Sequence, residues 1–406
     1  MVEVNKEYFV TIERMDHFGS GIGVIDGFVV FVAGTMIGEK VKIKITKCKK
    51  QFGVGEVVGF LKKTSARKQI ICPNFAYCGG CQLMHQDDSY QLQFKEHKIL
   101  ELLDKFVGLD VNVSPIIYGK FLSYRNKVIF HGQNGKVGFY QKKTNVVVPI
   151  SKCFLIDSEL NRIYQSFIAQ SFSGSELMLR KSSLGEVMVY LNTTQDSSLF
   201  LDWAKDYKIA SFYINDRLVW GKEYITELIL GMRFLILPKA FFQVNYHVML
   251  KMYQFIVDYY QKKSVSVVLD LYCGTGTIGM LVSPYVERVI GVEVVEDAIS
   301  SALRNRELNQ VSNISFVLGK VEDHIDEFHH IDSVIVDPPR SGLDRHTIET
   351  IIQIHPQSII YVSCDPATLA RDLKTLASFY EITIVQPFDM FPNTYHVETV
   401  CVLERK

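Results

Sequence analysis

The stretch Val265-Ser-Val-Val-Leu-Asp-Leu-Tyr-Cys-Gly-Thr-Gly-Thr-Ile-Gly279 decides how the C-terminal part of the chain folds. Its first seven residues form an apolar run rich in β-branched side chains, which is typical of a buried strand. Gly274, Gly276 and Gly279 follow with the spacing G-x-G-x-x-G. Glycines at this spacing let the backbone turn sharply and approach a ligand closely. The stretch therefore predicts a strand, a ligand-binding loop and the start of a helix.

Strand-like and helix-like segments alternate through the rest of the C-terminal part. The expected helices are Ala298–Asn309 and Pro366–Leu376, and the expected further strands are Arg288–Glu293, Ile314–Leu318, Ser333–Asp337, Ser358–Ser363, Ile382–Pro387 and His396–Leu403. This alternation predicts an α/β domain, doubly wound around a mostly parallel, Rossmann-like sheet. Ligands of such sheets bind at the carboxyl ends of the strands, where the polar motifs of this chain fall.

Acidic residues at three strand ends favour S-adenosylmethionine over a dinucleotide as the ligand of the glycine loop. Asp270 ends the strand before the loop, where a carboxylate meets a cationic amino-acid group better than a pyrophosphate. Glu293 ends the next strand and can accept both ribose hydroxyls. Asp337-Pro-Pro-Arg340 gives a later strand a rigid, polar end that is common in methyltransferases. A nicotinamide site and a plain tight turn are the alternatives.

Two further residues carry groups for covalent chemistry. Cys364 follows a strand and precedes Asp365-Pro366, a helix start with proline in the first turn. A thiol at a helix N-terminus has a lowered pKa, so we expect a reactive thiolate. Glu398 lies just inside the last strand, after a proline turn and His396. The alternatives are an inert packed thiol and a carboxylate on a solvated strand face.

A thiolate, a carboxylate and a methyl donor together define one reaction, methylation of uracil at C5. Uracil C5 is a poor nucleophile until a thiolate adds at C6 and leaves electron density on C5. After C5 has taken the methyl group, a base must remove its proton so that the thiolate can leave. Methylation of an amino group would need neither Cys364 nor Glu398.

The sequence resembles the S-adenosylmethionine-dependent RNA 5-methyluridine methyltransferases over nearly its whole length. The matching segments are Phe241-Phe-Gln-Val-Asn245, Asp270-Leu-Tyr-Cys-Gly-Thr-Gly276, Asp337-Pro-Pro-Arg340, Ser363-Cys-Asp-Pro366 and His396-Val-Glu398. The resemblance implies that Cys364 is the nucleophile and Glu398 the general base. It implies that Phe241 stacks near the target base and that Asn245 supports the site. It also implies four cofactor contacts, from Gln243, Tyr272, Glu293 and Asp337.

Four of the eight cysteines form a candidate metal centre. Cys72, Cys78 and Cys81 make a Cys-x5-Cys-Gly-Gly-Cys clip, and Cys153 is a distant fourth candidate. Four thiolates suit an iron–sulfur cluster or a structural zinc ion. One short hook plus two single cysteines favours the cluster, and unliganded thiols are the third possibility. The same clip occurs in a branch of the resembled family that binds a [4Fe–4S] cluster, which implies these four ligands, although Asn145–Pro149 departs from that branch's pattern.

The pattern along the chain predicts three domains. Residues 1–62 read as a β-barrel of the OB type, which resembles the RNA-binding TRAM domain of the same family. Its lysines gather over a short stretch, at Lys40, Lys42, Lys44, Lys47, Lys49 and Lys50. Residues 63–235 read as a central α+β domain with the cluster cysteines, and residues 236–406 as the methyltransferase domain. A solvated strand face is the alternative interpretation of the lysines.

The net charge of zero conceals an uneven distribution. Residues 1–264 hold 34 basic and 24 acidic side chains, whereas residues 265–406 hold 10 and 20. The basic part coincides with the domains expected to hold RNA, whose phosphates attract cations. No apolar run reaches the roughly 20 residues of a membrane helix, and the charged N-terminus lacks an apolar signal core. We therefore expect a cytoplasmic, monomeric enzyme that acts on RNA and has no membrane partner.

The sequence leaves the target open. Analogy with the resembled family favours 23S ribosomal RNA, and transfer RNA is the alternative. An amino- or DNA-methyltransferase is a rival because Asp337-Pro-Pro-Arg340 resembles the strand-end motif of those enzymes. A non-catalytic RNA-binding factor is a further rival, against which the presence of both Cys364 and Glu398 argues.

Overall fold

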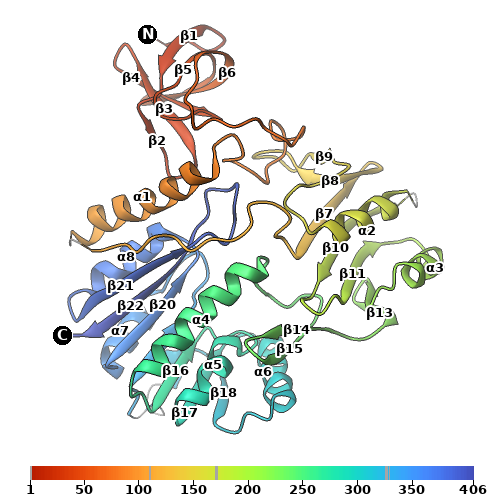
Figure 1. Ribbon diagram of the computed structural model, residues 1–406, viewed down its shortest axis with the longest axis vertical. Coiled ribbons are helices and arrows are strands. Elements are labelled where there is room, and N and C mark those ends of the chain that lie inside the picture. The colour runs from red at the N-terminus through yellow and green to blue at the C-terminus, as the bar shows by residue number, and fades with distance from the viewer. Residues whose placement is uncertain (1, 109–110, 170–171, 325–327, 329) are drawn as a thin grey trace. The chain divides into compact units, whose positions relative to one another are not determined.

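The computed structural model describes residues 2–108, 111–169, 172–324, 328 and 330–406 (Figure 1). Contacts between residues divide the chain into two compact units. The first contains Met1–Lys98, Phe139–Ile150 and Phe391–Tyr395, and the second contains the remainder. The three-domain division of the sequence stays a prediction.

The first unit contains a six-stranded sheet with the order β1-β5-β6-β4-β3-β2. Its strands are β1 (Glu7–Thr11), β2 (Arg14–Met15), β3 (Ser20–Ile25), β4 (Phe28–Ala33), β5 (Lys40–Cys48) and β6 (Phe52–Lys62). All its pairs are antiparallel except β4 with β6. Alternation along β5 buries Val41, Ile43 and Ile45 in the core and leaves the intervening lysines on the outer face.

Helix α1 (Asp88–Val107) begins in the first unit, after the cysteine clip. Its buried polar residues Gln91, Lys95 and Lys98 recur at intervals of four and three, so they share one face of the helix. The segment Phe391–Tyr395 belongs to this unit as well, although its neighbours on both sides along the chain belong to the second.

The second unit contains two sheets and a hairpin. One sheet has the order β13-β12-β11-β10-β7-β8, and the last residues of β8 and strand β9 belong to the first unit. These strands are β7 (Lys127–Gln133), β8 (Lys136–Tyr140), β9 (Val147–Pro149), β10 (Gly174–Lys181), β11 (Val187–Thr193), β12 (Ser211–Ile214) and β13 (Arg217–Gly221). Helices α2 (Ser158–Ile168) and α3 (Ser198–Asp206) and the hairpin β14 (Ile225–Ile229) and β15 (Met232–Ile236) complete this part.

The C-terminal sheet confirms the expected doubly wound α/β class. Its order is β18-β17-β16-β19-β20-β22-β21, and the pairs are parallel except those made by β22. The strands are β16 (Val267–Leu271), β17 (Arg288–Glu293), β18 (Ile314–Leu318), β19 (Ser333–Val336), β20 (Ser358–Ser363), β21 (Tyr380–Phe388) and β22 (Glu398–Arg405). Flanking it are α4 (Tyr246–Lys262), α5 (Thr277–Val282), α6 (Glu296–Leu308), α7 (Arg345–Ile354) and α8 (Pro366–Leu376), with short 3₁₀ turns at Ser283–Tyr285 and Val321–Asp323 (Figure 1).

Candidate functional site

The glycine loop joins β16 to α5 and is held by a buried carboxyl group. Asp270 is 1% exposed, and its Oδ2 accepts a hydrogen bond of 3.0 Å from the backbone N–H of Gly279. Gly276 adopts φ +76°, and a Cβ there would lie 2.7 Å from the Phe316 ring. A Cβ on Gly279 would lie 2.8 Å from Asp270 Oδ2. Larger residues at these two positions would push the loop apart, so the loop depends on both glycines.

Glu293 and Tyr272 line the same loop. Glu293, at the end of β17, accepts backbone hydrogen bonds from Gly274 at 3.1 Å, Val294 at 2.8 Å and Val295 at 2.9 Å. Each carboxylate oxygen has two acceptor positions, so Oε2 retains capacity for a ligand hydroxyl. Tyr272 has φ +60°, a strained value for a non-glycine residue, and its hydroxyl lies 3.2 Å from Thr347 Oγ1. Strain of this kind is characteristic of ligand-binding loops.

Strand register brings Cys364 and Glu398 to the same end of the sheet. In the antiparallel pair of β20 and β22, Ser363 lies opposite Thr399. Cys364 is the next residue beyond this pair on one strand, and Glu398 is the next residue on the other. Cys364 is half-buried and Glu398 is 3% exposed. The two predicted catalytic residues therefore lie at the same end of two neighbouring strands, close enough for the charge of Glu398 to raise the pKa of the Cys364 thiol.

Two buried carboxyl groups, Asp270 and Glu398, and the half-buried Asp337 share this region of the second unit. Burial raises the pKa of Asp270 to about 8, and the charges of Asp337 and Glu293 add to the shift. Burial alone raises the pKa of Asp337 to about 7. Burial, together with the charge of Asp337, raises the pKa of Glu398 to about 8. Removal from water and mutual repulsion both favour the neutral acids, and a cationic ligand would relieve both effects.

The surroundings of Cys364 correct one expectation. Asp365 caps α8 by accepting hydrogen bonds from the N–H groups of Ala367 and Thr368, as the sequence predicts for a helix start. The pKa of the Cys364 thiol is nevertheless raised to about 12, by burial first and then by the charges of Glu398 and Asp337. The prediction of a lowered pKa is therefore wrong for the protein without ligands, because burial and two carboxylates outweigh the helix terminus.

Two residues of this region were not assigned roles from the sequence. The positive charge of Arg340 lowers the pKa of both Cys364 and Glu398, so this guanidinium lies near both groups. Its position at the end of the Asp337 motif was the signal that could have identified it. Tyr253 on α4 is buried, and the charges of Asp337, Glu398 and Asp270 raise its pKa beyond the effect of burial. Nothing in the apolar pattern of α4 distinguishes Tyr253 from a core residue.

The segment before α4 exposes one aromatic ring and buries its neighbour. Phe241 is 76% exposed, whereas Phe242 is 6% exposed and packs with its ring centroid 6.3 Å from that of Phe234. Gln243 is also buried, at 6% exposure. Asn245 caps α4 by accepting a hydrogen bond from the Val248 N–H, and its Nδ2 donates to Met390 O at 3.2 Å. An exposed ring beside buried neighbours has its face available for stacking.

The candidate metal ligands are divided between the two units. Cys72, Cys78 and Cys81 lie in the first unit and Cys153 in the second, and all four are half-buried thiols. Cys78 Sγ accepts a hydrogen bond of 3.4 Å from the Gly80 N–H. Within the part of the chain that the structure describes, no three His, Cys, Asp or Glu side chains are grouped closely enough to hold a metal ion. The donor types, four thiols, are those that bind an iron–sulfur cluster.

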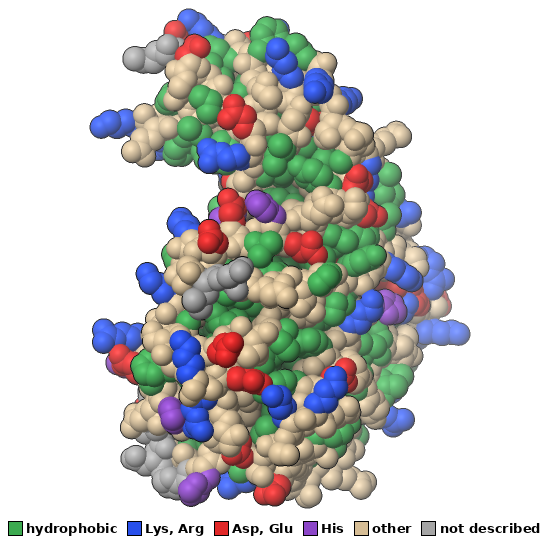
Figure 2. All heavy atoms as spheres, turned by 60° about the vertical axis from the view of Figure 1, so that its left-hand side comes forward, with side chains coloured by type: hydrophobic (Ala, Val, Ile, Leu, Met, Phe, Trp, Pro, Cys, Tyr) green, Lys and Arg blue, Asp and Glu red, His purple; other side chains and the backbone are tan. Residues whose placement is uncertain are grey.

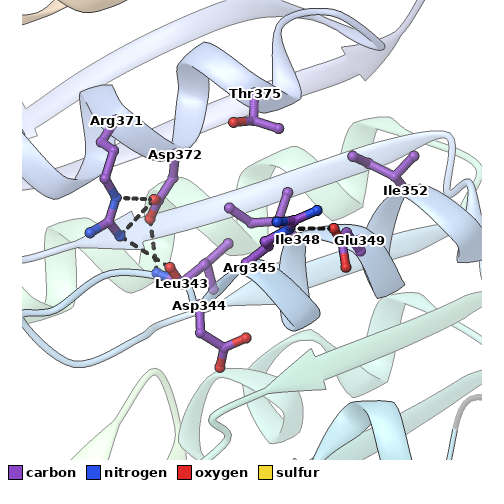
Figure 3. A pocket seen from close by; sticks show the side chains of 9 residues that line it. All are labelled: Leu343, Asp344, Arg345, Ile348, Glu349, Ile352, Arg371, Asp372 and Thr375. Carbon is purple, nitrogen blue, oxygen red and sulfur yellow. Dashed lines mark hydrogen bonds and ion pairs between the residues drawn. The ribbon is translucent and has the colours of Figure 1, made fainter.

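A pocket of about 570 Å³ lies elsewhere in the second unit, between α7 and α8 (Figure 3). The buried Asp372 carboxylate at its edge accepts hydrogen bonds from Arg371 Nε at 2.8 Å, the Leu343 N–H at 2.8 Å and the Tyr361 hydroxyl at 2.7 Å. The hydrogen-bonding capacity of this carboxylate is therefore used by groups of the protein itself. None of the predicted site residues lines this pocket.

Two protein-family models match different parts of the chain. Residues 206–406 match the model of the tRNA (uracil-5-)-methyltransferase family, and residues 2–58 match the TRAM domain. An uncharacterized RNA methyltransferase of Clostridium acetobutylicum is 33% identical over 451 aligned positions, which cover 100% of this chain and 98% of the relative. One from Clostridium tetani is 34% identical, over 99% of this chain and 97% of the relative.

A solved structure extends the similarity to the whole fold. It is the tRNA (uracil-54, C5)-methyltransferase of Pyrococcus abyssi in complex with S-adenosyl-L-homocysteine. The two chains are 27% identical, with a TM-score of 0.78, and the match covers 98% of this chain and 100% of the other. In the described part of this chain, the helices are too short or too polar to cross a membrane.

Proposed function

Because this chain belongs to the family of S-adenosylmethionine-dependent RNA (uracil-5-)-methyltransferases and carries a TRAM domain, we propose that Cys364 and Glu398 perform the methylation of a uridine at C5. The observation that carries the assignment is the Ser363–Thr399 pairing, which puts a half-buried thiol and a buried carboxyl group side by side at the carboxyl end of β20. Parallel sheets bind their ligands at this end.

The reaction then divides into addition and elimination. Cys364 Sγ forms a bond to C6 of the uracil, and the C5–C6 electron pair moves toward C5 and the C4 carbonyl. S-adenosylmethionine would supply the methyl group that C5 takes, with its S–CH₃ bond breaking to leave S-adenosylhomocysteine. Glu398 then accepts the C5 proton, the pair of the C5–H bond re-forms the C5–C6 double bond, and the C6–S bond breaks to return the thiolate. The RNA leaves with a 5-methyluridine.

The charged groups around Cys364 decide when the thiolate forms. Without ligands, burial and the neighbouring carboxyl groups hold the thiol in its protonated form, with a pKa of about 12. Arg340 opposes this effect and favours the charged forms of both Cys364 and Glu398. We assign Arg340 the role of stabilising the thiolate once the site has excluded water. A reactive thiolate that forms only in the loaded site is protected from side reactions in the free protein.

The residues around the glycine loop fit a cationic, ribose-bearing cofactor. Gly274 and Gly276 have a left-handed backbone conformation, which lets the chain approach a ligand closely. Glu293 Oε2 keeps capacity to accept a hydrogen bond from a hydroxyl group. Asp337 is half-buried and has a raised pKa, which suits a group that a positive ligand ionises. We propose Gln243, Tyr272, Glu293 and Asp337 as the cofactor contacts. Phe241 offers an exposed ring on which the target base can stack.

The proposed RNA target is 23S ribosomal RNA, with transfer RNA as the second candidate. Transfer RNA is favoured by the likeness to the Pyrococcus abyssi enzyme, which is a tRNA (uracil-54, C5)-methyltransferase. Nucleoside mass spectrometry of separated rRNA and tRNA from a deletion strain decides between them. Loss of 5-methyluridine from the rRNA fraction supports the first target, and loss from the tRNA fraction replaces it with the second. Loss of a methylated adenine instead would contradict uracil chemistry altogether.

We propose the four cysteines Cys72, Cys78, Cys81 and Cys153 as ligands of a [4Fe–4S] cluster. No step of the proposed methylation reaction involves this cluster. Four half-buried thiols are the support for this proposal. An anaerobic preparation tests it through its iron and acid-labile sulfide content. Four of each per chain supports the cluster, and one zinc without sulfide refutes it.

A further inference from the structure

The segment Phe391–Tyr395, which we call the clasped segment, is held by a buried polar face of α1. It lies between β21 and β22, and Glu398 begins β22 only three residues after Tyr395. The segment nevertheless belongs to the first unit, with the first part of α1 up to Lys98 and the cysteine clip. The residues that lead directly into the proposed base are thus held within the first unit, whereas Glu398 itself belongs to the second.

Asn393 is the centre of the anchorage. It is fully buried and has φ +66°, a left-handed conformation that asparagine tolerates better than most residues. Gln91 Oε1 accepts a 2.9 Å hydrogen bond from the Asn393 N–H, and Gln91 Nε2 lies 3.3 Å from Asn393 Oδ1 as donor. The N–H groups of Gln82 and Leu83 both donate to Asn393 O at 3.0 Å. Gln82 directly follows Cys81, so the cysteine clip leads into the residues that hold Asn393.

Two lysines of α1 hold the ends of the clasped segment. Lys95 Nζ donates to Phe391 O at 3.1 Å, and Lys98 Nζ donates to Tyr395 O at 3.2 Å. The Lys98 ammonium also lies 5.3 Å from the centroid of the Tyr395 ring. Lys95 is 0% exposed and Lys98 is 8% exposed.

Burying these groups is unfavourable unless each is bound, and an apolar helix face would contribute more to stability. Lysines at this spacing instead fix backbone carbonyls, and so they fix the path of the segment. A path held at both ends and at its centre limits the positions available to the residues that follow directly. Proton transfer is sensitive to such limits, since a base must lie within hydrogen-bonding distance of the proton it removes.

We propose that the Gln91–Lys95–Lys98 face of α1 is a positioning element that holds the clasped segment so that Glu398 is placed for removal of the C5 proton. The inference rests on the proposed role of Glu398. It assigns to α1 a function in the elimination half of the reaction, after the methyl group has been transferred.

Two isotopes separate the two halves of the reaction. With methyl-¹⁴C cofactor and RNA carrying 5-³H uridine, ¹⁴C in RNA reports methyl transfer and released ³H reports proton removal. For Gln91→Leu in the full-length protein, we expect ¹⁴C transfer in the first turnover close to that of the wild type. We expect ³H release to slow about ten-fold or more, with a covalent protein–RNA complex accumulating, since small displacements of a reacting group cost rate on this scale. Gln93→Leu, an exposed position on the same helix, is the matched control.

Two other outcomes would contradict the positioning role of α1. Equal ³H release in Gln91→Leu and Gln93→Leu overturns the positioning role, and so does an equal fall of both isotope signals, which indicates a merely structural face. If Gln91→Leu unfolds at a markedly lower temperature than the control, Lys98→Met replaces it, because that change removes the contacts with Tyr395 at the end of the segment and leaves Asn393 bound. Glu398→Gln is measured alongside. If this variant does not separate ¹⁴C transfer from ³H release, the role of Glu398 itself is overturned. If it does separate them and Gln91→Leu behaves like the wild type, only the inference about α1 is overturned.

Discussion

Ser363 lies opposite Thr399 in the antiparallel pair of β20 and β22. β20 runs parallel to its other neighbour, β19, so the residue after Ser363 is at the ligand-binding end of the sheet. The antiparallel direction of β22 brings its first residue, Glu398, to that same end. Because β22 is reversed, its first residue lies at the ligand-binding end of the sheet. If β22 ran parallel to β20, its last residue would lie there instead, and Glu398 would be at the opposite end.

The thiol of Cys364 is expected to be indispensable for methyl transfer. In Cys364→Ala, C6 of the uracil has no nucleophile, so turnover should fall by several orders of magnitude. RNA and cofactor dissociation constants should stay within about two-fold of the wild type, because the substitution removes one half-buried atom. Methyl incorporation and filter binding on the same preparation measure both quantities. Turnover equal to that of the wild type would exclude Cys364 as the nucleophile.

Glu398→Gln is expected to stall the enzyme after methyl transfer. The amide keeps the shape of the buried side chain but cannot take the C5 proton, and loss of a general base slows a step by about 10²–10⁴-fold. The protein should therefore accumulate as a covalent RNA complex that survives a denaturing gel. Glu404→Gln, at the far end of the same strand, is the control and should turn over normally. Free RNA and full turnover in Glu398→Gln would remove it as the base.

The sequence predicted the C-terminal sheet well because each of its strands is a short apolar run with a polar end. The run that ends at Leu271 and the run Ile314–Leu318 coincide with β16 and β18 to within two residues. The last strand was expected from His396 and begins at Glu398 instead. The apolar pattern alone could not show this, because the preceding residues bind α1 through contacts that span about 300 positions of sequence.

The chemistry of the site was harder to predict because it depends on charges that meet through space. The helix N-terminus beside Cys364 is visible in the sequence, but the opposing charge of Glu398 comes from a different strand. The surroundings of Glu293 could not be predicted from the sequence for the same reason. Its place at a strand end was predicted, but the three backbone N–H groups from which it accepts hydrogen bonds depend on how the loops after β16 and β17 fold together.

Affinity for S-adenosylmethionine is expected to increase with pH. The pKa values of Asp337 and Asp270 are about 7 and 8 without ligand, so part of these groups is protonated near neutrality. A cationic ligand favours the carboxylates, and binding below these pKa values must release protons. Affinity should therefore rise between about pH 6 and 8.5, by up to about ten-fold per pH unit for each proton released, and then level off.

Calorimetry in buffers of different ionisation enthalpy measures this proton release directly. S-adenosylhomocysteine lacks the sulfonium charge and should show a weaker pH dependence. Asp337→Asn removes one titrating group and should flatten the curve for S-adenosylmethionine. An affinity that stays constant over this pH range would contradict the proposal that Asp337 contacts the cofactor.

The outer face of the six-stranded sheet in the first unit is expected to supply much of the salt-dependent affinity for RNA. Register places Lys42 of β5 opposite Phe9 of β1, with Lys40 and Lys44 two residues to either side. Phe9 is 59% exposed, so its ring is available beside this row of lysines, of which Lys42 also pairs with Glu7, and Figure 2 shows basic and hydrophobic side chains together on the molecular surface. Replacing the three lysines by alanine should lower the slope of log affinity against log salt by about 0.7 for each single-strand phosphate that the protein no longer neutralises.

Binding titrations at several salt concentrations measure this slope, and Lys374→Ala, exposed in the acidic C-terminal part, should leave it unchanged. A slope equal to that of the wild type in the triple variant would show that the RNA binds another face.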